Sequence, residues 1–349
     1  MHSFPRPLWL QTAGLLAATL LMGCPSPDPA PLKPAPVEDN SRKPESEPSR
    51  QAPPAQRKAT APNPPISQAP VQQMLLHPFC HEQKNDSCFQ RIAGGSFWMG
   101  AQASDSDERN YDPVAQPDEG PVRKVTLSQY SLMVSAVSVQ KYQLCLKKGY
   151  CRSKDVQSGG ASWNLGRLER INHPVNGVSW EGARRYCEWV GGRLPTEAEW
   201  EFAARGTDGR RFPWGDEPRC GRYDPRAGAN KLAGSSSRRR RAVVECINDG
   251  TIATPDVRGR SPFRIVGQSG NVWEWVADWH APEGYPDEAE TNPRGPAQGR
   301  ERVQRGGGWA NQNPLELRAA ARGSLPPEMK LDDVGIRCAR DLPEGDTSR

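Results

Sequence analysis

A ten-residue stretch dense in charged side chains decides the fold. Residues 192–201 read Gly192-Arg193-Leu194-Pro195-Thr196-Glu197-Ala198-Glu199-Trp200-Glu201. Thr196 followed by Glu199 is the pattern of a capping box, in which each side chain accepts a hydrogen bond from the other residue's backbone N–H. We therefore expect a helix that begins after Thr196 and runs through Trp200 and Ala203. We interpret its charged residues, with Arg193, as a buried hydrogen-bonded framework rather than an acid–base site.

The segments on either side of this stretch indicate two more helices and two strands. Ser179 is a candidate N-cap for a helix over 179–190, and Gly191-Gly192 ends it. Ser138 is the candidate cap of an earlier helix. Residues 91–100 are expected to form a strand bent at its glycines, and the β-branched run 122–127 a second strand. Long stretches rich in Gly, Pro and Trp lie between, which indicates an α+β domain with little regular secondary structure.

Several blocks of sequence carry a resemblance to a known family. In chain order they are His173-Pro174-Val175-Asn176-Gly177-Val178-Ser179-Trp180, residues 192–201, Phe212-Pro213-Trp214-Gly215, Gly270-Asn271-Val272-Trp273-Glu274-Trp275 and Gly335-Ile336-Arg337-Cys338. Together they resemble the formylglycine-generating enzyme, or sulfatase-modifying factor, family across nearly the whole folded region. The resemblance implies a domain over 77–342 with that family's fold, which is related to C-type lectins. It does not by itself imply an activity.

The segment that carries the family's chemistry departs from the family pattern. In the family's oxidases, Arg-Gly-Gly-Ser is followed by an aromatic residue and by two cysteines five residues apart, which hold Cu(I). Here those positions are Asn311 and Glu316, and the serine is Gly308. Cu(I) is a soft ion that favours thiolates over an amide and a carboxylate. Copper and formylglycine generation are therefore not expected. A re-purposed cleft would use Asn311, Glu316 and Arg318.

The resemblance also implies a calcium site. The family places calcium at the Gly-Asn-x-Trp-Glu-Trp block, and Gly270, Val272 and Glu274 match its ligands. The side-chain ligand three positions before Gly270 is Gly267 here, which removes one oxygen. Because Ca²⁺ takes six to eight oxygens, any calcium bound here is expected to be held weakly.

Nine cysteines indicate an oxidising compartment. Without Cys24 eight remain, and short spacings favour Cys80–Cys88, Cys145–Cys151 and Cys220–Cys246, although spacing alone leaves many other connectivities open. The remaining pair, Cys187 and Cys338, matches a disulfide of the family. No CxxC occurs, which argues against a zinc ribbon.

The N-terminus has the pattern of a lipoprotein signal over 1–24. An uncharged run, Leu8–Leu21, precedes Met22-Gly23-Cys24, which looks like a lipobox with Cys24 as the lipidated residue. An ordinary secretory signal is the alternative. Residues 25–76 are a proline-rich tether, and 343–349 a tail. We expect a lipid-anchored protein of the bacterial cell envelope.

Charge gives no case for nucleic-acid binding, because the net charge is only +5 over 349 residues. The run Arg238–Arg241 could bind a polyanion, but a solvated insertion is the simpler interpretation. His77 and His81 fit a disulfide-closed turn better than a metal site. We therefore expect an envelope binding or scaffold module, a pseudoenzyme, for a protein or glycan. The alternatives are a divergent enzyme of the same family and a purely structural envelope protein.

Overall fold

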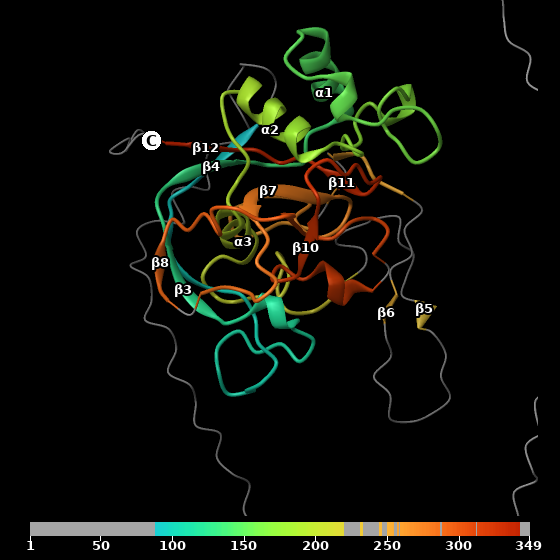
Figure 1. The fold of residues 1–349 in the computed structure, drawn as a ribbon. Helices are drawn as coiled ribbons and strands as arrows, with labels where there is room; N and C mark the ends of the chain where they lie inside the picture. The colour runs from blue at the N-terminus through green and yellow to red at the C-terminus, as the bar shows by residue number, and fades with distance from the viewer. Residues whose placement is uncertain are drawn as a thin grey trace, which may run out of the picture. The chain divides into compact units, whose positions relative to one another are not determined.

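The computed structural model describes residues 88–219, 231, 232, 244, 245, 250–254, 257, 259–286, 288–311 and 313–342 (Figure 1). The chain divides into two units, Met1–Ala69 and Pro70–Arg349, and every described residue belongs to the second. The predictions for the signal segment, Cys24, the tether, Arg238–Arg241 and the tail concern residues outside the described ranges. Among the described residues, no helix has both the length and the apolar character to cross a bilayer.

The described strands form four small sheets. One is antiparallel, in the order β1 (Phe89–Ile92), β4 (Tyr130–Met133), β12 (Ala339–Asp341). The central sheet has the order β10 (Arg322–Leu325), β9 (Arg302–Arg305), β7 (Trp273–Trp279), β11 (Val334–Gly335), and only its β7–β11 pair is parallel. A third contains β2 (Gly95–Met99), β3 (Arg123–Leu127) and β8 (Glu290–Thr291), and a fourth pairs β5 (Lys231–Leu232) with β6 (Val244–Glu245).

The segment expected to form one bent strand over 91–100 forms two strands in different sheets. β1 pairs with β4, and β2 pairs with β3. Gly94 makes the break, because its φ is +74° and a Cβ there would lie 2.4 Å from the carbonyl oxygen of Leu127. The glycine therefore turns the chain sharply enough to separate the two pairings. The strand expected over 122–127 is confirmed as β3.

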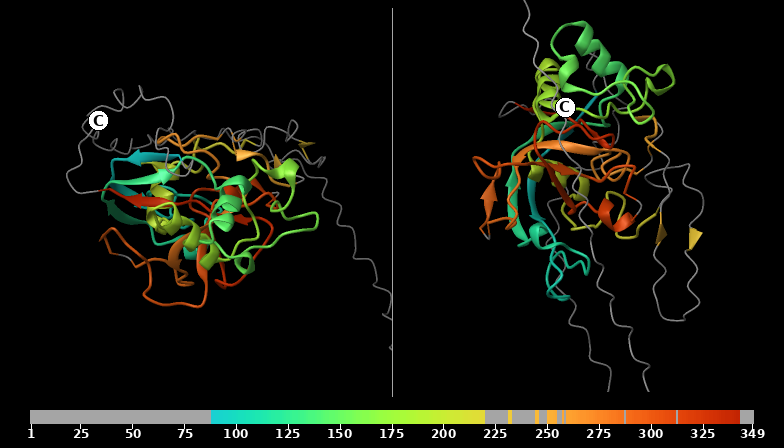
Figure 2. Two further views of the ribbon diagram at one scale, coloured as in Figure 1. Left: turned by 90° about the horizontal axis from the view of Figure 1, so that it is seen from above. Right: turned by 45° about the vertical axis from the view of Figure 1, so that its right-hand side comes forward.

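The three predicted helices are confirmed with their caps. They are α1 (Val139–Lys147), α2 (Trp180–Trp189) and α3 (Glu197–Arg205). Ser138 and Ser179 accept backbone hydrogen bonds at the starts of α1 and α2, and the capping box of α3 has both of its bonds. Short 3-10 turns occupy Pro117–Glu119, Ser153–Asp155, Leu168–Arg170 and Pro314–Leu317. Figure 1 and the right-hand view of Figure 2 both show α1 and α2 next to each other at one edge of the described domain.

Helix α3 is buried along its whole length, because it packs against two sheets at once. Trp200 packs with Val276 and Val303 of the central sheet. Phe202 belongs to a second cluster with Phe97 and Val125 of the β2–β3 sheet. Helix α3 therefore joins the central sheet to the β2–β3 sheet.

Helices α1 and α2 pack in a separate apolar cluster, which two disulfides reinforce. Cys145–Cys151 closes the turn after α1, and Cys187–Cys338 joins α2 to the segment between β11 and β12. Both predicted pairings are confirmed. Cys88 is also disulfide-bonded, while Cys80, Cys220 and Cys246 lie outside the described residues, so the other pairings stay predictions.

Candidate functional site

The start of α3 anchors the candidate site through buried ion pairs. Arg305, at the end of β9, is fully buried and bonds the carboxylates of Glu197 and Glu201. Arg322 bonds Glu197 from β10, and Arg205 bonds Glu201 from within α3. Each guanidinium thus pairs with a buried carboxylate. Without such a partner, the charge of the carboxylate would be strongly unfavourable in the protein interior.

The other charged residues of the 192–201 stretch are paired in the same way. Arg193 forms a two-pronged pair with Glu199, at 2.7 and 2.6 Å, and Trp200 donates its indole N–H to Glu274 at 2.7 Å. The interpretation of this stretch as a structural framework is confirmed. Each of its carboxylates, those of Glu197, Glu199 and Glu201, is bound by at least one guanidinium group.

The loop after Arg305 is shaped by two glycines with positive φ. Gly306 has a φ of +97° and Gly307 of +73°, and a Cβ on Gly307 would lie 2.2 Å from the side chain of Leu317. The carbonyl of Gly306 accepts a hydrogen bond from the N–H of Gly270 at 2.8 Å. Arg305, which precedes the loop, and the hydrogen bond from Gly270 therefore fix the position of the loop's first residues.

The two positions at which the sequence resemblance places the family's cysteines, Asn311 and Glu316, lie side by side. The side-chain amide of Asn311 donates to Glu316 at 2.6 Å, and its carbonyl oxygen accepts from the backbone N–H of Gly308 at 2.8 Å. Glu316 is exposed and Asn311 is half-buried. The fold thus brings this pair together, and a hydrogen-bonded amide and carboxylate occupy the place of two thiols.

Asp333 is a member of this site that the sequence reasoning missed. An ideal Cβ on Gly308 would lie 2.7 Å from the Cβ of Asp333 and 2.9 Å from its Oδ2. A serine side chain at position 308 would therefore collide with Asp333. Burial, together with the neighbouring charge of Asp332, raises the pKa of Asp333 to about 6. The available signal was its position directly before the Val-Gly-Ile-Arg-Cys block.

Arg318 does not share this location with Asn311 and Glu316. Its guanidinium is 3% exposed and pairs with Glu119, at 2.7 and 2.6 Å, and with Asp112 at 3.2 Å. Its Nε also donates to the carbonyl of Leu315. The prediction of Arg318 as a cleft residue is corrected, because its guanidinium is buried and is neutralised by the carboxylates of Asp112 and Glu119.

The residues of this loop do not fit copper. Asn311 and Glu316 supply an amide and a hard carboxylate, whereas Cu(I) requires soft ligands. Every cysteine among the described residues is disulfide-bonded, so none of them offers a thiolate here. No step of a copper-dependent oxidation can therefore be derived from this part of the chain.

The geometry at the Gly270 turn does not fit calcium either. Both carboxylate oxygens of Glu274 accept hydrogen bonds from Arg337 at 2.7 Å, and one also accepts from Trp200. The carbonyl of Gly270 accepts from the N–H of Val272 at 3.0 Å. These three hydrogen bonds occupy most of the acceptor sites of the Glu274 carboxylate, which leaves it little capacity to bind a calcium ion. Among the described residues, no group of three or more His, Cys, Asp or Glu side chains is arranged to hold a metal.

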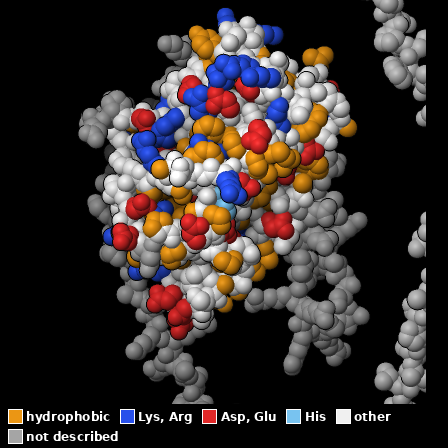
Figure 3. Space-filling view, in the orientation of Figure 1, with side chains coloured by type: hydrophobic (Ala, Val, Ile, Leu, Met, Phe, Trp, Pro, Cys, Tyr) orange, Lys and Arg blue, Asp and Glu red, His pale blue; other side chains and the backbone are white. Residues whose placement is uncertain are grey.

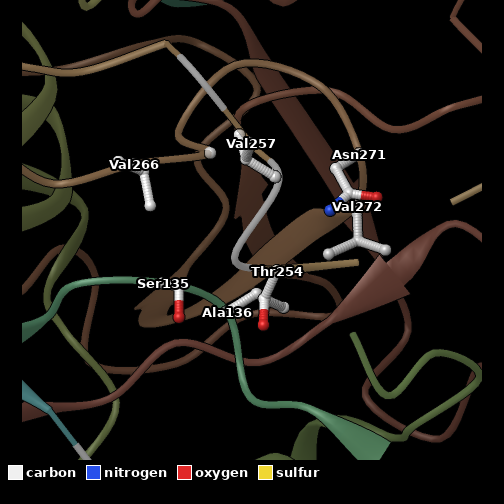
Figure 4. Close-up of a pocket in the computed structure, with 8 residues that line it drawn as sticks. Ser135, Ala136, Thr254, Val257, Val266, Asn271 and Val272 are labelled. Carbon is white, nitrogen blue, oxygen red and sulfur yellow. The ribbon is translucent and has the colours of Figure 1, made fainter. Parts of the chain in front are cut away.

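A small pocket opens beside the same turn (Figure 4). Its cavity volume is only about 10 Å³, and it is bordered by Ser135, Ala136, Thr254, Val257, Val266, Gly267, Asn271 and Val272. Both amide atoms of Asn271 are occupied by the backbone of Ile252, so this side chain does not point a free polar group into the space. The pocket is smaller than the several hundred Å³ typical of small-molecule sites, and it is formed by a different turn from the Asn311–Glu316 pair.

Fold and site together define an α+β domain with little regular secondary structure, held by disulfides and a buried charged framework. A family model described as "Sulfatase-modifying factor enzyme 1-like domain" matches residues 75–342. The chain belongs to this family, and it has the formylglycine-generating-enzyme fold, which is related to C-type lectins.

Three relatives place the chain within the family. A formylglycine-generating enzyme of Streptomyces coelicolor is 41% identical over 49% of this chain, which spans only about half (54%) of that relative. One of Thermomonospora curvata is 34% identical over 72% of this chain and 92% of its own length. A mouse protein named "Inactive C-alpha-formylglycine-generating enzyme 2" is 27% identical over 73% of this chain and 86% of its own.

A solved structure shares the fold. The structure of PvdO from Pseudomonas aeruginosa aligns over 76% of this chain and 98% of its own, with a TM-score of 0.57 and 22% identity. At this level of identity the likeness concerns the fold alone.

Proposed function

We propose that this protein is an envelope lipoprotein whose domain binds a protein or glycan and does not oxidise cysteine. The observation that carries the proposal is the Gly308–Asn311–Glu316 chain of hydrogen bonds, which fills the place of the family's thiol pair. The pairing of Asp333 with Gly308 supports it, because the loop is adapted to a glycine at that position. The existence of a relative that is named inactive is consistent with this reading.

The absence of oxidase chemistry can be tested with the full chain and a matched variant. The wild type, loaded with Cu(I) and given a cysteine-containing peptide, is expected to retain no copper and to produce no aldehyde. The variant Asn311→Cys/Glu316→Cys restores two thiols at adjacent positions and is expected to retain Cu(I), because soft ligands then face each other. Copper-dependent aldehyde formation by the wild type would overturn the proposal.

Ligand binding by the loop at 306–316 is tested with variants of that loop. Purified wild-type protein is applied to immobilised envelope glycans and envelope proteins, and each signal is compared with that of Glu316→Ala and Trp309→Ala. Trp309 is half-buried beside Asn311. Leu168→Ala is the matched control, since Leu168 is 86% exposed. We expect one ligand whose binding is weakened at least tenfold by the loop variants and not by the control; no loop-dependent ligand would contradict the proposal.

Lipid anchoring through Cys24 is a separate part of the proposal, supported by the lipobox-like pattern at residues 21–24. Wild-type protein in bacterial cells is expected to fractionate with membranes. Cys24→Ser is expected to lose the acyl chains and, if the signal is still cleaved, to appear in the soluble fraction. A soluble wild-type protein without acyl chains would contradict the anchoring.

A divergent enzyme is the second candidate, and Asp333 is the observation that favours it. A carboxyl group with a pKa of about 6, which lies against Gly308, the backbone partner of Asn311, suits proton transfer near neutral pH. If this candidate holds, Asp333→Asn and Glu316→Gln abolish an in vivo phenotype while the domain stays folded. Wild-type behaviour of both variants would exclude it.

A further inference from the structure

The turn that follows α1 concentrates cations and exposed apolar side chains at one edge of the domain. We call it the basic tip and define it by Leu144, Lys147, Lys148, Tyr150, Arg152 and Lys154. Its four cations are all exposed, Tyr150 is 61% exposed and Leu144 39%. No acidic residue occurs between positions 147 and 154. Figure 3 shows blue and orange side chains together at the top of the view, over the end where Figure 1 places α1.

The basic tip is held rigidly. The Cys145–Cys151 disulfide closes the turn, and the backbone N–H of Tyr150 donates to the carbonyl of Cys145. Tyr150 rests against Trp189 of α2, with ring centroids 6.3 Å apart. The tyrosine is therefore supported from below while most of its surface faces outward, so little conformational entropy is lost when it makes a contact.

The cations of the basic tip are not neutralised by any of the residues that the structure describes. Among the described residues, none of the four forms an ion pair. The carboxylates of α2, which contacts α1, are bound elsewhere, because Glu181 and Glu188 pair with Arg184. Asp155, which follows Lys154, is buried near Arg185. Lys330 adds a fifth positive charge, since its ammonium donates to the carbonyl of Lys154.

We propose that the basic tip docks the domain on an anionic lipid bilayer. Unpaired lysines and arginines are attracted to the negative surface of such a bilayer, and a tyrosine is suited to its interface because it has an apolar ring and a polar end. A soluble polyanion would satisfy the charges but would leave Leu144 and Tyr150 in water. The bilayer accounts for both features, which is why it is favoured over an acidic polysaccharide or a nucleic acid.

Lysine acylation on the full chain tests the docking. The protein is reconstituted into phosphatidylcholine vesicles with or without phosphatidylglycerol, and the acylation rate of each lysine is measured by mass spectrometry. We expect Lys147, Lys148 and Lys154 to react about fivefold more slowly, or slower still, when phosphatidylglycerol is present, and high salt to restore their rates. Lys124 is the internal reference, because it is exposed on β3, away from α1 in Figure 1.

A charge-reversed variant separates docking from mere proximity to the vesicle. Lys147→Glu/Lys148→Glu is expected to return Lys154 to its rate in neutral vesicles, whereas Lys124→Glu, the matched control, leaves Lys154 protected. Equal protection in both kinds of vesicle would mean that the protein is held near the surface without recognising it, and would overturn the proposal. Protection by dissolved dextran sulfate with none by anionic vesicles would also overturn it, in favour of a polyanion.

Discussion

Two regions of the domain, the framework at the start of α3 and the loop at 306–316, differ in how deeply their polar groups are buried. In the framework at the start of α3, Arg305, Glu201 and Arg205 are nearly or fully buried and bind one another. In the loop at 306–316, the partners Asn311 and Glu316 are hydrogen-bonded but half-buried and exposed. Removing one buried charge leaves its partner buried and unpaired, which costs stability. Removing one exposed group costs little, because water can hydrogen-bond to its partner. The fold therefore depends on the buried framework far more than on the polar groups of the loop at 306–316.

The largest expected effect comes from breaking the framework. Arg305→Met leaves Glu201 with Arg205 as its only ion-pair partner among the described residues, and it removes one of the two guanidinium groups that face Glu197. We expect the free energy of unfolding to fall by about 3–5 kcal/mol, as for other buried pairs that lose one partner. Urea denaturation followed by far-UV circular dichroism measures it.

Arg184→Met is the control for that experiment. Arg184 pairs with Glu181 and Glu188 on the surface of α2, where the side chains are at least a third exposed. Its loss is expected to change stability by no more than about 1 kcal/mol. Comparable losses in the two variants would contradict the contrast between buried and exposed pairs.

Asp278, which accepts a hydrogen bond from the N–H of Glu197 in the framework, is expected to make stability depend on pH. Burial and the charge of Glu197 raise the pKa of Asp278 to about 8, from 3.8. Because the folded state keeps this proton longer than the unfolded chain, the contribution of Asp278 to stability is complete below about pH 4 and is lost as the pH rises through about 8. The groups that face it are Glu197, Glu199, Arg322 and Arg302.

Asp278→Asn isolates this contribution, because the amide keeps an acceptor for the N–H of Glu197 and carries no charge. Thermal unfolding between pH 5 and pH 9, which brackets the upper pKa, is expected to show a smaller decline for the variant, with a difference on the order of a few kcal/mol. A wild type and variant that lose stability in parallel would assign the decline to other groups.

Replacing Gly308 tests whether the loop has become adapted to its new residues. Gly308→Ser introduces a side chain into space that Asp333 occupies, and is expected to cost about 1–3 kcal/mol as an overpacked substitution. Gly308→Ser combined with Asp333→Gly is expected to recover part of that loss, which a double-mutant cycle measures. Strict additivity of the two changes would mean that they do not share the space.

The smallest expected effect lies in the pair that replaced the thiols. Glu316→Ala leaves Asn311 its bond to Gly308 and access to solvent, so stability should change by no more than about 0.5 kcal/mol. The same denaturation experiment checks it. A loss close to that of Arg305→Met would show that the loop is part of the structural framework.

Local sequence signals predicted the helices and the framework well. They predicted less well the features that depend on residues far apart in the chain. Caps at Ser138, Ser179 and Thr196 act through neighbours three residues away, so the sequence contains both partners of each bond. The single strand expected over 91–100 was wrong because the partners of its two halves lie in different sheets. Arg318 was misplaced for the same reason, since its partners, Asp112 and Glu119, are about 200 residues away.

The sequence by itself determined the family, the three helix starts and the absence of sulfur at positions 311 and 316, because each is a matter of residue type at a short spacing. Only the tertiary structure decided which charges are neutralised. It placed Glu274 on Arg337, brought Asp333 against Gly308 and left the cations of the basic tip without an ion pair among the described residues. The physical reason is that the state of a charged group depends on its burial and on neighbours from distant parts of the chain, and neither can be read from a run of residues.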